Sequence, residues 1–237
     1  MTAQQTDIAD SPNPANQDTA NGLQPDFDAE AEFDRQVQRL LHKGYPALAG
    51  LEPSAFRELI APLHQVVLQS KPDLAPPTRA RVPFVLVITK QLLPAAPAMA
   101  LTELNGKPGF VTDGFDDVDR FAPIDSVELP AGSAYVIFDV DRGAEYLNIR
   151  PNDALVSIAA AGRTPLTVDE GIAFITHFPD SLEKNHCFSL LASRGEDQRV
   201  PALWISKATP KLGWCWAGNP HTWLGSASAA TRSGLPQ

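Results

Sequence analysis

The sequence has few cysteines, no long apolar run and no basic residues near its N-terminus, and each absence excludes a class of protein. Two cysteines among 237 residues, Cys187 and Cys215, are too few for a disulfide framework. No apolar stretch approaches the roughly 20 residues that span a bilayer, so we expect no membrane partner. Residues 1–34 contain no lysine or arginine, which argues against a secretory signal or a transit peptide. We therefore expect a cytoplasmic protein.

Acidic and basic residues are distributed unevenly along the chain. The formal net charge is −9, from 19 basic and 28 acidic residues, and eight of the acids lie in residues 1–34. The rest of the chain is close to neutral, so it lacks the basic excess of a nucleic-acid-binding domain. Residues 198–237 contain no acid and four bases, which favour a small anionic ligand. These bases are Arg199, Lys207, Lys211 and Arg232.

Residues 1–26 differ in composition from the rest of the chain. They are rich in Asn, Gln, Asp, Pro, Ala and Thr and bury too little apolar surface to offset the chain entropy of folding. We expect a disordered acidic tail. The first interpretation is that this tail is simply solvated, and the alternative is that it contacts a protein partner. Residues 27–237 are expected to form a single α+β domain, since 43% of the sequence is hydrophobic.

Helical spacing of apolar residues and one capping motif predict four helices. Pro62 falls inside the second helix and is expected to kink or divide it. Thr167 and Glu170 form the T-x-x-E capping box that opens the fourth helix. The predicted helices cover residues 29–43, 54–70, 152–161 and 167–178.

Apolar, β-branched runs predict the strands. Asn105-Gly106 indicates a turn, and Phe110-Val111 is interpreted as the strand that returns from it. The polar stretch 193–199 is expected to be a hairpin loop. Helices and strands do not alternate regularly, so we predict an α+β fold with a mainly antiparallel or mixed sheet. The predicted strands cover residues 82–89, 135–140, 188–192, 200–205 and 213–217.

The segment 210–225 contains the densest group of chemically distinctive residues. Three of the four tryptophans lie within it, together with a cysteine, a histidine and several glycines and prolines. In an extended strand, Trp214 and Trp216 share one face and Cys215 points to the other. One interpretation is core packing; the other is a ligand pocket with aromatic walls. The predicted ligand-binding residues are Trp214, Trp216, Asn219, Trp223 and Lys211.

Cys215 and His221 are the candidate catalytic residues. Five residues separate them through a Gly-Asn-Pro turn, and a thiol nucleophile needs a nearby base. Neighbouring tryptophans would desolvate the thiol and raise its pKa, which opposes activation. No known nucleophile signature surrounds Cys215.

A metal site is weighed and not predicted. His186 and Cys187 are adjacent, so in a strand their side chains point to opposite faces, and no histidine or cysteine spacing matches a zinc pattern. Asp139 and Asp141 end a predicted strand and would suit magnesium, but no P-loop accompanies them.

Several motifs together resemble an uncharacterised bacterial family of unknown function. They are Val200-Pro-Ala-Leu-Trp-Ile-Ser-Lys, the run from Pro210-Lys-Leu-Gly-Trp-Cys-Trp to Gly225, Gly162-Arg-Thr-Pro-Leu and Tyr135-Val-Ile-Phe-Asp. The resemblance extends back to about Gly44 and implies no activity.

The residues therefore predict a protein that binds a small organic or anionic molecule in a Trp-rich C-terminal pocket. Whether it is also an enzyme, and which cofactor it would use, is left open. The alternative is a non-catalytic interaction or structural module whose tryptophans pack in the core or against a protein partner.

Overall fold

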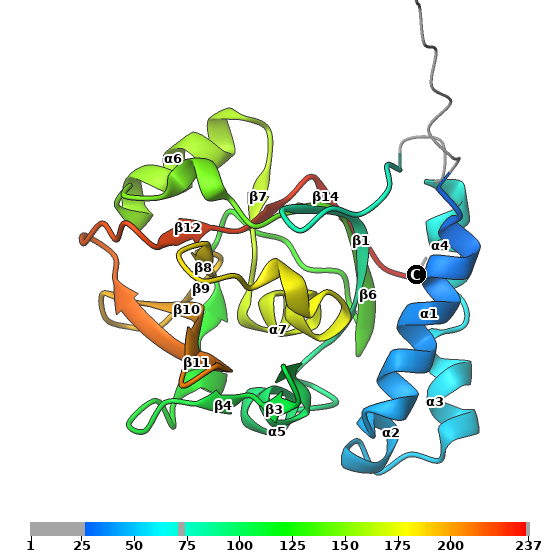
Figure 1. Cartoon of the computed structure of the whole chain (residues 1–237). Coiled ribbons are helices and arrows are strands. Elements are labelled where there is room, and N and C mark those ends of the chain that lie inside the picture. The colour runs from blue at the N-terminus through cyan, green and yellow to red at the C-terminus, as the bar shows by residue number, and fades with distance from the viewer. Residues whose placement is uncertain (1–26, 71–73, 236–237) are drawn as a thin grey trace, which may run out of the picture.

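A computed structural model describes residues 27–70 and 74–235 and has an α+β fold (Figure 1). The fold class predicted from the sequence is thus confirmed. The predicted acidic tail, residues 1–26, lies outside the described residues. One apolar core cluster extends from Ala29 to Ala229. Within the described ranges, no helix is long and apolar enough to cross a membrane.

Four N-terminal helices form one layer of the molecule, at the right of Figure 1. The first begins at Asp28, whose carboxylate accepts hydrogen bonds from the backbone N–H groups of Glu30 and Ala31. Pro62 divides the second predicted helix into two, as expected for a residue without a backbone N–H. The helices of this layer are α1 (Ala29–His42), α2 (Tyr45–Leu48), α3 (Pro53–Ile60) and α4 (Leu63–Gln69).

The first sheet packs against these helices. Its two long antiparallel strands are the apolar runs that the sequence predicts, and Phe84 pairs with Phe138 in their register. The short C-terminal strand β14 lies along the other edge of β6, where it carries Arg232 towards the middle of the molecule. The strands are β1 (Arg81–Ile88), β6 (Ala134–Asp141), β7 (Thr164–Pro165), β13 (Ser228–Ala229) and β14 (Thr231–Ser233).

The second sheet carries the candidate site. Its centre is the antiparallel hairpin of β10 (Arg199–Ser206) and β11 (Thr209–Trp216), closed by Lys207 and Ala208. The sheet is mixed, because β12 pairs with β8 and β4 pairs with β11 in parallel. The remaining strands are β8 (Cys187–Ser189), β12 (Leu224–Ser226) and β4 (Phe110–Val111).

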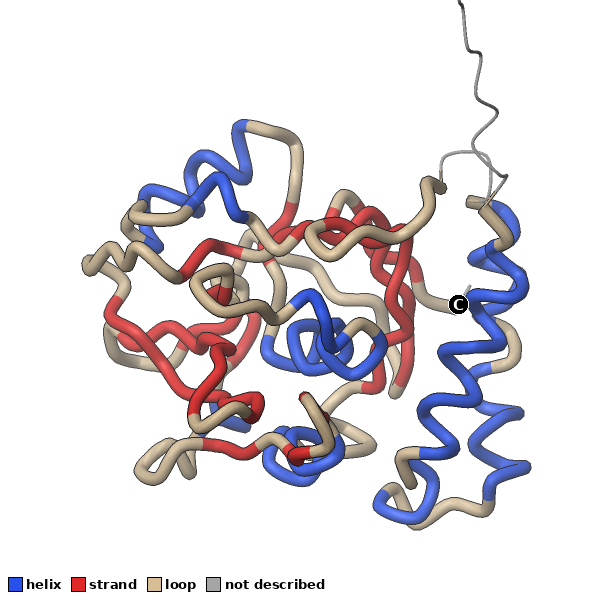
Figure 2. The backbone as a smooth tube through the Cα atoms, viewed as in Figure 1, coloured by secondary structure: helices blue, strands red, loops and turns tan. Residues whose placement is uncertain are grey.

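Helix α7 (Val168–His177) lies between the two sheets (Figure 2). The predicted capping box is present: Thr167 Oγ accepts from Glu170 N–H, and a Glu170 carboxylate oxygen accepts from Thr167 N–H. Every residue of α7 except Asp169 is buried, so the helix forms the centre of the core. Helix α6 (Pro151–Ala160) lies outside, near β7 and β12.

The structure corrects the hairpin predicted around Asn105-Gly106. The strand that returns from this turn is β3 (Lys107–Pro108), which pairs with β2 (Glu103–Leu104). Phe110–Val111 instead joins the second sheet beside β11. The reason is that a two-residue turn pairs its immediately adjacent residues, so the return begins at Lys107.

Part of the predicted loop 193–199 is also a strand. Ser193 and Arg194 form β9, which pairs with β5 (Ala122–Pro123). Four short helical segments complete the fold: α5 (Ala95–Leu101), η2 (Val118–Arg120), η3 (Ala144–Tyr146) and η4 (Pro179–Ser181).

Candidate functional site

A cavity of about 510 Å³ opens beside the tip of the β10–β11 hairpin. This volume lies within the range of small-molecule sites. The lining contains two tryptophans, a cysteine and two lysines, and it contains no acidic residue. We call it the Trp204–Trp223 pocket; its lining residues are Lys184, Asn185, Cys187, Trp204, Ile205, Lys207, Ala208 and Trp223.

Two indole rings form an aromatic corner of the pocket. The ring centroids of Trp204 and Trp223 lie 6.0 Å apart, with the ring planes at 69°. The hairpin register places Trp204 opposite Lys211, whose Nζ lies 5.2 Å from the centroid of the Trp204 ring. Gly213 lies under the same ring, and a Cβ there would overlap it. Lys211 and Gly213 therefore fix the position of Trp204.

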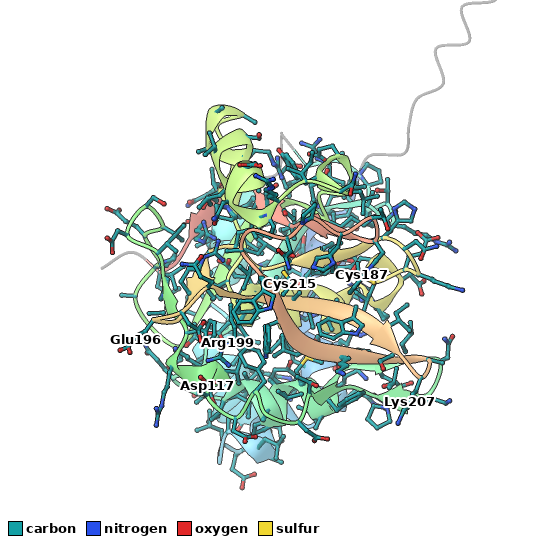
Figure 3. All side chains as sticks on the ribbon, turned by 90° about the vertical axis from the view of Figure 1, so that its left-hand side faces the viewer. Asp117, Cys187, Glu196, Arg199, Lys207 and Cys215 are labelled. Carbon is teal, nitrogen blue, oxygen red and sulfur yellow. The ribbon has the colours of Figure 1, made fainter. Side chains whose placement is uncertain are left out.

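The pocket is bounded by two turns with left-handed backbone conformations. Lys207 and Ala208 have φ angles of 54° and 63°, and Asn185 has 66°. A two-residue hairpin turn with positive φ at both positions usually contains Asn-Gly, because other side chains are strained there. Among the described residues, the other non-glycine residues with positive φ are all Asn or Asp. Lys207 and Ala208 are therefore the two described residues that adopt this strained conformation without being Gly, Asn or Asp, and both line the pocket. Figure 3 shows Lys207 at the hairpin tip.

Cys187 contributes a neutral, polarisable surface to the pocket. Its side chain is buried, and its Sγ donates to the carbonyl oxygen of Glu183 at 3.4 Å. Burial raises the pKa of the Cys187 thiol, so the thiol form predominates at neutral pH. Lys184 and Lys207 are exposed, so the ammonium groups of the pocket are hydrated while its inner wall is apolar.

The structure brings some of the sequence-predicted residues to this pocket. Trp223 lines it, and the His221 ring packs beside Trp223 with a centroid distance of 5.5 Å. Lys211 does not line the pocket but holds Trp204 from the neighbouring strand. Asn219 is exposed in the turn that follows β11, where its N–H donates to the carbonyl oxygen of Trp216.

Trp214 and Trp216 lie elsewhere on the hairpin. As predicted, they share one face of β11, and their ring centroids are 4.8 Å apart. This is the face opposite to that of Lys211 and Gly213. The guanidinium of Arg199 lies 5.8 Å from the Trp214 ring. Figure 3 shows Arg199 at the end of the hairpin away from Lys207, so this tryptophan pair does not form a wall of the pocket.

Cys215 and His221 have separate surroundings. Cys215 is buried, and its Sγ lies 3.6 Å from Ser189 Oγ in β8. Burial raises the pKa of the Cys215 thiol. His221 instead packs on Trp223, and its carbonyl oxygen accepts from Asn148 N–H. These contacts do not join the imidazole to the thiol, so the nucleophile hypothesis gains no geometric support.

The carboxylates considered for metal binding have protein partners. Asp139 is bound by Arg81 and Arg163, and these guanidinium groups hold its pKa below the usual range. Asp141 accepts a hydrogen bond from Gly143 N–H. Within residues 27–70 and 74–235, no group of three or more His, Cys, Asp or Glu side chains is arranged to hold a metal ion.

The sequence alone did not indicate that Trp204, Cys187 and Lys207 would lie together in one pocket. The signal that links them is the pairing of strands: β10 brings Trp204 between Cys187 on β8 and Lys211 on β11. Alternation along a single strand gives the face of a residue but not its cross-strand neighbours.

Comparison with known proteins provides a family but no activity. Residues 39–235, most of the chain, match the model of a family described as family of unknown function (DUF5701). No curated protein and no solved structure matches the chain.

Proposed function

Because the chain belongs to this family of unknown function, DUF5701, we propose its function from the chemistry of the pocket: it binds a small, flat organic anion at the Trp204–Trp223 pocket. The observation that carries the proposal is the combination of an aromatic corner with a lining whose charged residues are all lysines. Flat apolar ligands stack on indole rings, and the two ammonium groups favour a carboxylate or phosphate substituent.

The contacts that hold Trp204 support the same proposal. Lys211 and Gly213 fix one indole, and the strained Lys207-Ala208 turn bounds the lining. A preformed site loses less conformational entropy when its ligand binds. No reaction is included in the proposal, because both thiols near the hairpin have pKa values raised by burial. The cytoplasmic location and the role of the tail remain predictions.

Tryptophan fluorescence tests this proposal directly. The probes are aromatic carboxylates and nucleoside monophosphates, each paired with its neutral amide or nucleoside. We expect saturable quenching by the anions and weaker binding of the neutral partners. Trp223→Ala should abolish binding, and Lys207→Gln should raise the Kd roughly three- to tenfold. Trp216→Phe is the matched control and should bind normally; binding unchanged in Trp223→Ala, or absent for every anion, would overturn the proposal.

A second candidate function rests on Trp216. This side chain retains 45% of its surface exposed, beside Trp214 and outside the pocket. Exposed tryptophan is enriched at protein interfaces, so an interaction surface made by the tryptophan pair is the alternative. The partner tested first is a second copy of the chain: sedimentation should show concentration-dependent association that Trp216→Ser removes. A monomer at all concentrations would exclude self-association.

A further inference from the structure

A second cavity, which shares no lining residue with the Trp204–Trp223 pocket, lies between α1 and the β2–β3 turn. Its volume is about 720 Å³, and it also borders η4. Arg35, Arg39 and His42 of α1 line one side of it, and Lys43, the residue that caps the helix, lies beside them. The opposite side includes Glu103 and Asp180.

Two of these cations already have partners. Arg35 donates from Nε and Nη2 to the two carboxylate oxygens of Glu32, both at 2.7 Å, and from Nη1 to the carbonyl oxygen of His177. Lys43 Nζ lies 3.3 Å from a carboxylate oxygen of Glu103. The charges of Arg35 and Lys43 are therefore largely neutralised by contacts within the protein.

Arg39 differs from both. Its guanidinium makes no hydrogen bond to any residue in the part of the chain that the structure describes, and its Nε is buried without a partner. Burial and the neighbouring charge of Arg35 lower the pKa of Arg39. Asp180 is exposed on the opposite rim and forms no ion pair with it. Arg39 thus carries a partly desolvated charge that the protein does not neutralise by contact.

We propose that this cleft binds a small phosphomonoester, with the phosphate on the guanidinium of Arg39. A guanidinium recognises phosphate oxygens through two parallel N–H donors, and Arg39 is the arginine of this cleft whose charge no carboxylate among the described residues pairs. Asp180 and Glu103 lie on the other side of the cleft, where they would accept hydrogen bonds from ligand hydroxyl groups. The expected ligand class is therefore a phosphorylated molecule that also carries hydroxyls. This site shares no residue with the Trp204–Trp223 pocket and does not depend on the function proposed there.

Calorimetry and thermal unfolding with glycerol phosphate test the site, with sodium chloride at matched ionic strength as the control salt. We expect glycerol phosphate to bind and to raise the Tm of the full chain, inorganic phosphate to do so less, and chloride to leave the Tm unchanged. Arg39→Gln should weaken binding on the order of tenfold or more. Arg39→Lys keeps the charge but loses the two-point contact, so it should bind several-fold more weakly than the wild type.

Arg57→Gln is the matched control, since Arg57 is an exposed arginine of α3 outside the cleft. It should bind glycerol phosphate as the wild type does. Equal binding by Arg39→Gln and the wild type would overturn the proposal. An equal rise in Tm with chloride would also overturn it, because it would indicate general screening of charge. Circular dichroism shows whether Arg39→Gln folds. If it does not fold, Arg39→Lys is the variant that tests the proposal. Binding of glycerol phosphate by Arg39→Lys equal to that of the wild type would likewise overturn it.

Discussion

Arg232 in β14 forms a two-point ion pair with Glu170 in the first turn of α7. Its Nε and Nη2 lie 2.6 Å and 2.8 Å from the two carboxylate oxygens of Glu170. The hydroxyl of Tyr135 in β6 donates to the same carboxylate at 2.9 Å. Glu170 also caps α7 through Thr167 N–H. One buried carboxylate therefore joins a helix start, a central strand and the C-terminal strand.

Removing one partner of this pair should destabilise the protein strongly. Arg232→Met leaves a buried carboxylate without its cation, and we expect the free energy of unfolding to fall by about 3–5 kcal/mol. Glu103→Gln is the comparison, because Glu103 is half exposed in its pair with Lys43 and should change stability by about 0–1 kcal/mol. Urea unfolding measures both. Similar small losses would show that the Glu170 pair is not important for stability.

Gly213→Ala should disturb the pocket through Trp204. The added Cβ would overlap the indole ring, so the ring or β11 must shift, at a cost of about 1–3 kcal/mol. Gly218→Ala is the matched control, because nothing lies within 4 Å of a Cβ at that position. Thermal unfolding and tryptophan emission should change in Gly213→Ala alone. An unchanged emission spectrum in that variant would mean that the ring is not held against Gly213.

The stability of the protein should depend on the ionisation of Asp169. Burial raises the pKa of Asp169 to about 6 from 3.8, so the folded state binds the proton more tightly than the unfolded chain does. The stabilisation by protonation is present at low pH and is lost as the pH rises from about 4 to about 6. Asp169→Asn should therefore be more stable than the wild type by about 1–3 kcal/mol near pH 7.

This gain from Asp169→Asn should shrink as the pH falls and vanish below about pH 3, where the wild-type carboxyl is protonated in both the folded state and the unfolded chain. The amide oxygen of the variant can still accept the hydrogen bond that Lys90 N–H donates to Asp169. Urea unfolding of both proteins across this pH range gives the comparison. A difference that does not change with pH would contradict the raised pKa of Asp169.

Both thiols should react slowly in the native protein. Cys187 and Cys215 are buried, and burial raises the pKa of each. Labelling with a disulfide reagent at neutral pH should be on the order of 100-fold slower than in urea, because the thiolate is the reacting form. His221→Ala should leave the rate unchanged. Rapid labelling of Cys215 that His221→Ala slows would restore the nucleophile hypothesis.

Features of the fold that local sequence determines could be predicted. Pro62 lacks a backbone N–H and divides a helix, and Thr167 with Glu170 caps another, whatever surrounds them. The ion pair between Glu170 and Arg232 could not be predicted in this way. Its partners are 62 residues apart in sequence, and no local pattern specifies which long-range partner a charged side chain meets.

In the candidate site, too, local features could be predicted and long-range contacts could not. Alternation along β11 correctly places Trp214 and Trp216 on one face. The pocket, however, is formed by Trp204 and Trp223. Their proximity depends on the register of β10 with β11 and on the parallel pairing of β12 with β8. A one-residue change of register would turn Trp204 to the other face, and composition alone does not fix that register.

The position of β14 has a consequence for synthesis on the ribosome. The segment from β1 to α7 emerges before Arg232 does, so during translation Glu170 has no cation to meet it. Early burial of its carboxylate would be unfavourable, and the first sheet also lacks the strand that borders β6. A nascent chain arrested between α7 and β14 should therefore remain loosely packed and sensitive to protease, and should become resistant once Arg232 has left the exit tunnel.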